Sequence, residues 1–134
     1  MIRFENINLR TNTAKGKLSM SIEAKLTNLV NSLKKRAEYE IKDNDFYRTI
    51  NEHFINKDKN LCCKSVALSI SQDEHKPAQH LLEISMLHPS MQIENKRPLV
   101  MGSKSDILKF LKDEKSVKIL LQDISQMSDK LSGI

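Results

Sequence analysis

The sequence predicts an α+β fold in which an antiparallel sheet of three to five strands has amphipathic helices packed on one face. Two runs in the middle of the chain alternate large apolar residues with small or polar ones, namely Val66, Leu68, Ile70 and then Leu82, Ile84, Met86. A strand turns successive side chains to opposite faces, so each run has one apolar wall and one polar wall. Apolar residues at steps of three and four, before and after these runs, predict the helices.

The first expected element is a strand near the start of the chain. Ile2 and Phe4 alternate with polar neighbours, and Ile7 and Leu9 do so in a shifted phase, which predicts a strand with a bulge or break between them. After a turn at residues 11–16, residues 17–22 fit either a second strand, paired in a hairpin with the first, or an early start of the next helix.

Two helices are expected next. Ser21 is a suitable N-cap for the first helix, whose apolar stripe is formed by Ile22, Leu26, Leu29, Val30, Leu33, Ala37 and Ile41. A break at residues 43 and 44 follows, and a short helix with Phe46, Ile50 and Phe54 on one side is predicted to run to about residue 55.

The two alternating runs predict an antiparallel hairpin whose loop contains Pro77. Its outward face is small and polar on the first strand, whereas the second strand offers Leu81 and Leu87 there. Large apolar groups on the face opposite the core are a candidate protein interface. Residues 98–101 predict a last short strand, at a sheet edge because Pro98 cannot donate a ladder hydrogen bond.

Two helices are predicted to complete the chain. Ser103 and Asp106 match a capping box, which predicts a helix start. The apolar stripe that begins at Val117 does not continue the one that ends at Leu111, so a break is expected at residues 113–116, and Gly133 is a natural C-cap. The expected order is β(β)ααβββαα, in one domain over residues 1–134.

Composition fits a globular chain, with 39% hydrophobic and 29% charged residues and only three Gly and three Pro. No stretch approaches the roughly 20 apolar residues of a membrane span, and the first residues lack the apolar region of a secretory signal. A cytoplasmic location without a membrane partner is therefore expected. Cys62 and Cys63, placed in a predicted strand, are interpreted as reduced structural thiols, because adjacent cysteines lack the spacing of a chelating pair.

The formal net charge of +5 raises the possibility of a nucleic-acid partner. The best candidate contact is the run of Lys34, Lys35 and Arg36, together with Lys42. A second basic surface would lie on the C-terminal helices, which carry Lys104, Lys109, Lys112, Lys115 and Lys118. Acidic residues are interspersed among these cations, which is typical of an ordinary solvated surface.

No group of residues meets the spacing rules of a catalytic, cofactor or metal site. His80 and His88 would lie roughly 26 Å apart on one strand, too far to share a metal ion. Tyr47, Arg48, Glu52 and His53 would share the short helix without a catalytic spacing. Residues 101–105 lack the first glycine of a P-loop, so capping explains them better.

The expected order of elements resembles that of small ribonuclease toxins of the toxin and antitoxin type. The chain differs from that group in its missing Trp, its few Arg residues and its extra C-terminal helix, so no catalytic residue is carried over. The sequence favours a non-enzymatic protein that binds another protein or its own copy. The alternative is a nucleic-acid-binding protein, ribonuclease-toxin-like proteins included.

Overall fold

The computed structural model describes residues 20–134. Within this range the elements follow in the order α1 (Met20–Glu40), β1 (Ile50–Ile55), β2 (Ser65–Gln72), β3 (His80–Leu87), β4 (Glu94–Gly102), α2 (Lys104–Lys112) and α3 (Ser116–Ser132). The strands form one antiparallel sheet in the order β1-β2-β3-β4. An α+β fold with an antiparallel sheet of the expected size is confirmed.

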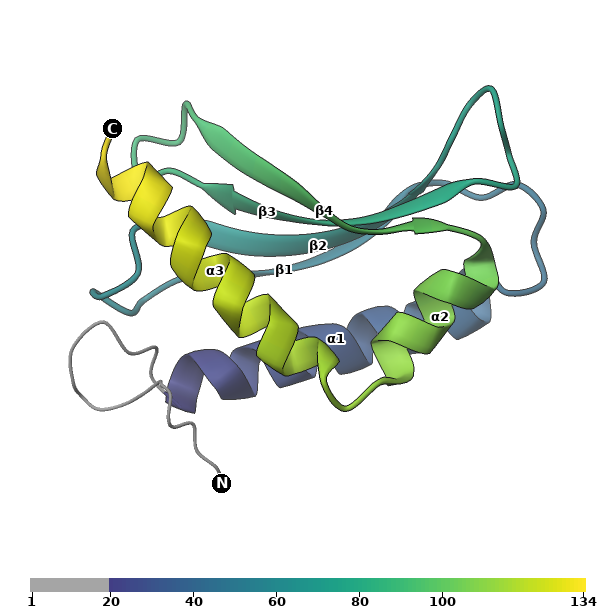
Figure 1. Cartoon of the computed structure of the whole chain (residues 1–134), viewed down its shortest axis with the longest axis horizontal. Coiled ribbons are helices and arrows are strands. Elements are labelled where there is room, and N and C mark those ends of the chain that lie inside the picture. Colours follow the sequence, from purple (N-terminus) through teal and green to yellow (C-terminus); the bar gives the residue numbers. More distant parts are fainter. Residues whose placement is uncertain (1–19) are drawn as a thin grey trace.

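Figure 1 shows α1, α2 and α3 on the same side of the sheet. The second face of the sheet is not covered by any element of residues 20–134 (Figure 1). No helix in this range combines the length and apolar character needed to cross a membrane.

Helix α1 forms where the apolar stripe predicted it. All seven residues of that stripe, from Ile22 to Ile41, are buried, because steps of three and four keep them on the face that contacts the sheet and α3. The predicted N-cap is wrong, since the helix already includes Met20 and Ser21. Residues 20–22 are thus helical, while the strands expected over residues 2–9 and 17–19 fall outside the described residues.

The prediction of a short helix that ends near residue 55 is wrong, because Ile50–Ile55 forms strand β1. Ile50 and Phe54 are four residues apart, and a spacing of four places two side chains on one face of a strand as well as of a helix. Pairing decides between them, since Ile50 lies opposite Ile70 and Phe54 opposite Val66 in the antiparallel ladder with β2. The order is therefore αββββαα over the described residues, not β(β)ααβββαα.

The predicted hairpin is confirmed as β2 and β3. Its six inward residues, Val66, Leu68, Ile70, Leu82, Ile84 and Met86, have no solvent exposure and form the centre of the core. The last strand, β4, is an edge strand as expected. It has nine residues, Glu94–Gly102, whereas the sequence predicted a strand only over residues 98–101. A register shift between Leu82 and Glu83 marks an irregularity in its pairing with β3.

The C-terminal helices begin and break where the sequence predicted. Ser103 Oγ accepts a hydrogen bond from Asp106 N, and Asp106 Oδ2 accepts one from Ser103 N, so the capping box of α2 is complete. Helix α2 ends at Lys112 and α3 starts at Ser116. Gly133 is the C-cap of α3, as predicted.

The cysteines are free thiols but lie just before β2, so their placement in a strand is wrong. Cys62 N donates to Ser128 Oγ over 2.8 Å, which ties this segment to α3. Cys63 is buried, and this burial is the main cause that raises the pKa of its thiol to about 12. The nearby Cys62 and Asp58 raise the pKa further. Such a thiol stays protonated at neutral pH and packs as a small apolar group.

Candidate functional site

The side of the sheet that no element of residues 20–134 covers, called the open face below, contains the side chains that alternate with the core residues. Cross-strand pairing defines its members, which are Asn51, His53, Ile55, Ser65, Ala67, Ser69, Ser71, Leu81, Glu83, Ser85, Leu87, Glu94, Lys96, Pro98 and Met101. Four of these are large and apolar, and most of the others are small or polar.

The large apolar side chains lie at the two ends of the open face. Leu81 pairs with Met101 at one end, and Leu87 lies at the other end on β3, with Ile55 two strands away on β1. Met101 is 62% exposed and Ile55 46% exposed, whereas Leu81 and Leu87 are half-buried by their neighbours. The structure thus places both predicted interface residues on the open face, among further apolar groups.

Short side chains occupy the middle of the open face. Every outward residue of β2 is serine or alanine, and Ser85 continues this region onto β3. Another protein surface can approach the backbone of a sheet more closely where the side chains of the sheet are short. Stacked sheets, for comparison, lie about 10 Å apart. The open face therefore has a low centre between two apolar ends.

The open face carries charges of both signs. Lys96 Nζ and Glu94 Oε1 form an exposed ion pair of 3.6 Å along β4. Glu83, on β3, has no ion pair with any residue of the described part of the chain. Its carboxylate and the weakly held ammonium of Lys96 are therefore free to meet opposite charges from outside.

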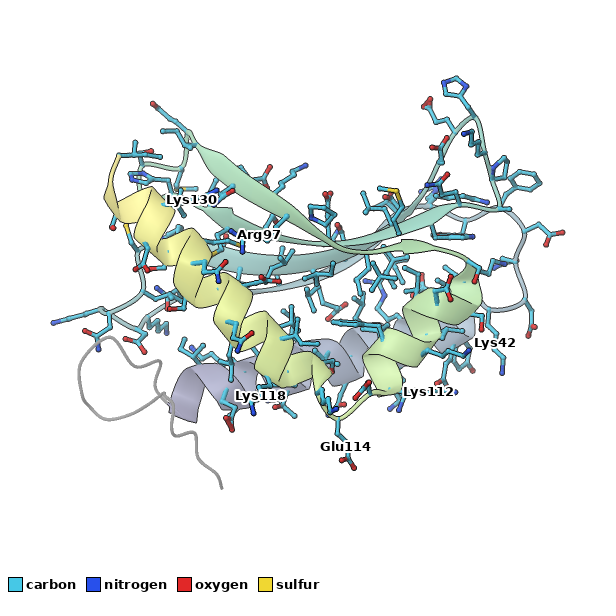
Figure 2. All side chains as sticks on the ribbon, in the orientation of Figure 1. Lys42, Arg97, Lys112, Glu114, Lys118 and Lys130 are labelled. Atoms are coloured by element: carbon cyan, nitrogen blue, oxygen red, sulfur yellow. The ribbon has the colours of Figure 1, made fainter. Side chains whose placement is uncertain are left out.

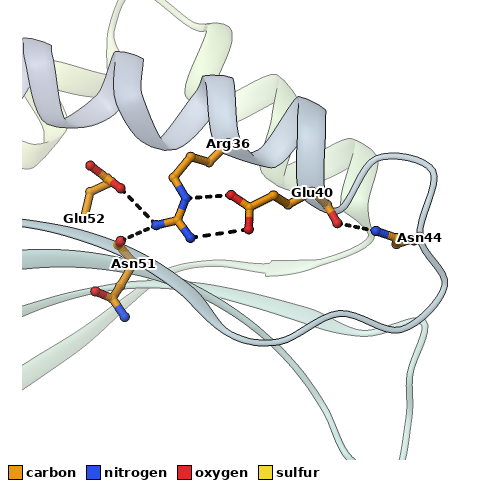
Figure 3. Close-up of polar contacts among 5 residues, drawn as sticks. All are labelled: Arg36, Glu40, Asn44, Asn51 and Glu52. Carbon is orange, nitrogen blue, oxygen red and sulfur yellow. Dashed lines mark hydrogen bonds and ion pairs between the residues drawn. The ribbon is translucent and has the colours of Figure 1, made fainter.

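Arg36, part of the predicted nucleic-acid contact, is held by carboxylates (Figure 3). Its Nε donates to Glu40 Oε2 over 2.7 Å, and its Nη1 donates to Glu52 Oε2 over 2.9 Å and to Asn51 O over 2.7 Å. These hydrogen bonds, first to Glu40 and then to Glu52, raise the pKa of Arg36, and the bond from Arg36 lowers the pKa of Glu40. The guanidinium joins α1 to the edge strand β1, and its charge is offset by the two acids.

The lysines predicted to contact nucleic acid remain at the surface without forming one basic stripe. Lys35 and Lys42 are exposed and Lys34 is half-buried. Figure 2 shows Lys42, Lys112 and Lys118 at separate points along the helical layer, with Glu114 between Lys112 and Lys118. Nucleic-acid binding by these lysines remains a prediction.

A cavity of about 500 Å³ lies beside the first residues of β3 and α2. Its lining residues come from three separate segments of the chain and are Asp45, Phe46, Pro77, Ala78, His80 and Lys104. Gln72 fixes two of these segments, because its Nε2 donates to Asp45 O over 2.6 Å and to Pro77 O over 2.8 Å. The cavity walls are thus held by hydrogen bonds from the end of β2.

His80 is the buried polar residue of this cavity, with 2% exposure. Its Nδ1 lies 2.6 Å from Tyr47 Oη, and the two rings are parallel within 4°. Burial is the main cause that lowers the pKa of His80, and the positive charge of Lys104 is the second cause. Burial also raises the pKa of Tyr47 to about 12. At neutral pH the phenol therefore keeps its proton and the imidazole is uncharged.

The structure separates most of the residues that sequence reasoning considered together. Glu52 faces α1 while His53 lies on the open face, and His88 bonds to Ser90 at the far end of β3. No cluster of three metal-ligating side chains occurs within residues 20–134. The sequence did not predict that Tyr47 and His80 form a pair. The one signal for it in the sequence is that His80 occupies an inward position of its strand, where the other residues are apolar.

The comparisons with known proteins identify no relative. No family model, no curated protein and no solved structure matches this chain.

Proposed function

We propose that this protein is a non-enzymatic binding domain whose open face binds the open face of a second copy of the chain. The observation that carries this proposal is the combination of apolar ends, short central side chains and an absence of cover by any element of residues 20–134. Burial of apolar surface is the main driving force of protein association. Leu81, Leu87, Met101 and Ile55 supply it.

A second copy is the occupant that the charges of the open face favour. A two-fold axis places the same surface on both sides, so a self-complementary surface must contain both members of each cross-interface pair. Glu83 and Lys96 provide an acid and a base on adjacent strands, and neither is held by a strong partner within the described residues. In the dimer, Glu83 of each copy lies opposite Lys96 of the other.

The size of the open face predicts a weak dimer. Four strands spaced about 4.8 Å apart and about eight residues long give a projected area of roughly 500 Å² per copy. The two copies together bury about 1,000 Å², which is near the lower limit for a specific interface. We therefore expect association in the micromolar range and not the permanent dimer of a large apolar interface.

The substitution Ala67→Glu tests the proposal, because Ala67 lies in the low centre of the open face between His53 and Ser85. Two glutamates brought together at the dimer centre repel each other without touching the core. Sedimentation velocity across the micromolar range should show concentration-dependent dimers for the wild type and monomers for the variant. Asn31→Glu, an equal charge change on the exposed side of α1, is the matched control and should still dimerise.

Circular dichroism of the same samples checks that the Ala67→Glu variant is folded. A wild-type protein that stays monomeric over the whole range, or an Ala67→Glu variant that dimerises like the control, would overturn the proposal.

Nucleic-acid binding is the second candidate function, and the net charge of +5 is the observation that favours it. Exposed Lys35 and Lys42, with half-buried Lys34, are the groups available for phosphate, since Arg36 is already paired. Gel-shift assays with short RNA and DNA at low salt should then show binding that weakens steeply as salt is added. Binding that survives replacement of all three lysines by Gln would exclude this surface.

A further inference from the structure

The cavity beside His80 has two kinds of wall. The ring of Phe46, which is 76% exposed, forms the apolar wall with Pro77 and Ala78. The polar residues of the lining are His80, Lys104 and Asp45, and Asp45 is its one acidic residue. A volume of about 500 Å³ lies within the roughly 300 to 1,000 Å³ range of small-molecule sites.

The hydrogen bond to Tyr47 decides what His80 offers to a ligand. At neutral pH the phenol of Tyr47 is protonated and the imidazole is uncharged, so the 2.6 Å contact between Tyr47 Oη and His80 Nδ1 fits two tautomers. With Tyr47 as the donor, the ring proton of His80 lies on Nε2. No residue of the described part of the chain bonds to Nε2. In this tautomer the Nε2–H is the donor that His80, a lining residue of the cavity, offers to a ligand.

Lys104 supplies a second donor with a full positive charge. Its Nζ donates to the carbonyl oxygen of Asn44, which is a neutral acceptor, and no carboxylate of the described residues forms an ion pair with it. An ammonium beside a cavity and an adjacent imidazole N–H together fit a carboxylate, since charged acceptors form the stronger hydrogen bonds.

Asp45 sets the charge that the rest of the ligand must carry. A purely anionic molecule would be repelled by this carboxylate, whereas a molecule that also carries an ammonium group gains a partner. The apolar wall of Phe46, Pro77 and Ala78 lies beside these polar groups and fits a hydrophobic side chain.

We infer that this cavity binds a free amino acid with a large apolar side chain. Lys104 and the Nε2–H of His80 hold the α-carboxylate, Asp45 holds the α-ammonium, and the side chain packs against Phe46. The cavity lies outside the open face, so this binding is separate from self-association and does not depend on it.

The probe for the experiment is phenylalanine, titrated into the ¹⁵N-labelled full chain and followed by amide NMR shifts. We expect saturable shifts at residues 45–47, 78–80 and 103–105. Phenylpropionate lacks the amine and phenethylamine lacks the carboxylate, so each should bind at least tenfold more weakly than phenylalanine. Absence of saturable shifts with phenylalanine, or equal binding of phenylpropionate, would overturn the inference.

Two variants test the assigned contacts without touching the core. Lys104→Met should weaken phenylalanine binding at least tenfold, while Lys109→Met, on the exposed side of the same helix, should leave it unchanged. Phe46→Ala removes an exposed ring and should weaken binding without unfolding the protein. Unchanged affinity in both Lys104→Met and Phe46→Ala would show that phenylalanine binds elsewhere and would refute the assignment.

The Ala67→Glu variant separates this inference from the proposed function. It should bind phenylalanine like the wild type, because Ala67 lies on the opposite side of the sheet from His80. Loss of phenylalanine binding in this variant would contradict a cavity that works independently of the open face.

Discussion

The protonation of His80 is coupled to folding, because the folded protein disfavours its charged form. Burial lowers the pKa of His80 below that of an unfolded histidine, which is about 6.5. The resulting stability is fully present above pH 6.5 and is lost as the pH falls through the lower pKa of the folded state. At acidic pH the unfolded chain takes up a proton that the folded chain resists.

We therefore expect the free energy of unfolding to fall between pH 7 and pH 5, with a slope of at most about 1.4 kcal/mol per pH unit from this group. Urea titrations at several pH values should show a shallower dependence in His80→Gln than in the wild type. His75→Gln, in the exposed β2–β3 loop, is the control and should keep the wild-type slope. Equal slopes in all three proteins would contradict the coupling.

Single residues also show where sequence reasoning stops. The capping pair Ser103 and Asp106 was predictable because its two members are three positions apart and their geometry is local. The contact of Tyr47 with His80 joins residues 33 positions apart, and that of Arg36 with Glu52 joins residues 16 apart. Such pairs depend on how strands and helices are placed, which one sequence does not reveal.

At the level of elements, the start of α2 depends on its capping box. Ser103→Ala removes the acceptor for Asp106 N and should destabilise the protein by about 1 kcal/mol. Ser105→Ala, an exposed change within the first turn, should stay within about 0.5 kcal/mol of the wild type. Urea unfolding followed by circular dichroism measures both, and equal stabilities would show that the cap contributes nothing.

The segment before β2 shows why one element was assigned to the wrong class. Ile50 and Phe54 satisfy the repeat of a helix and of a strand, so periodicity alone does not choose between them. The ladder to β2 selects the strand, and Arg36 adds a bond from α1 to Asn51 O on β1. In contrast, α1 has six apolar positions, from Ile22 to Ala37, that fit the helical repeat and no other.

Across the whole molecule, the alternation in β2 and β3 is what separates a core face from an open face. That two-sided pattern was readable from the sequence because a strand has a period of two, and it placed Leu81 and Leu87 correctly. The cavity beside His80 was not readable, since its walls come from three segments that meet only after folding.

Adjacent substitutions on β3 should therefore have opposite outcomes. Ile84 has no solvent exposure and pairs with Leu68, so Ile84→Asp buries a carboxylate without a partner. The penalty of several kcal/mol is comparable to the roughly 5–15 kcal/mol that stabilises a whole domain, and we expect the variant to be unfolded at 25 °C. Ser85→Asp changes the next residue, on the open face, and should keep the far-UV circular dichroism and amide NMR dispersion of the wild type. A folded Ile84→Asp protein would mean that the apolar side of β3 is not the centre of the core.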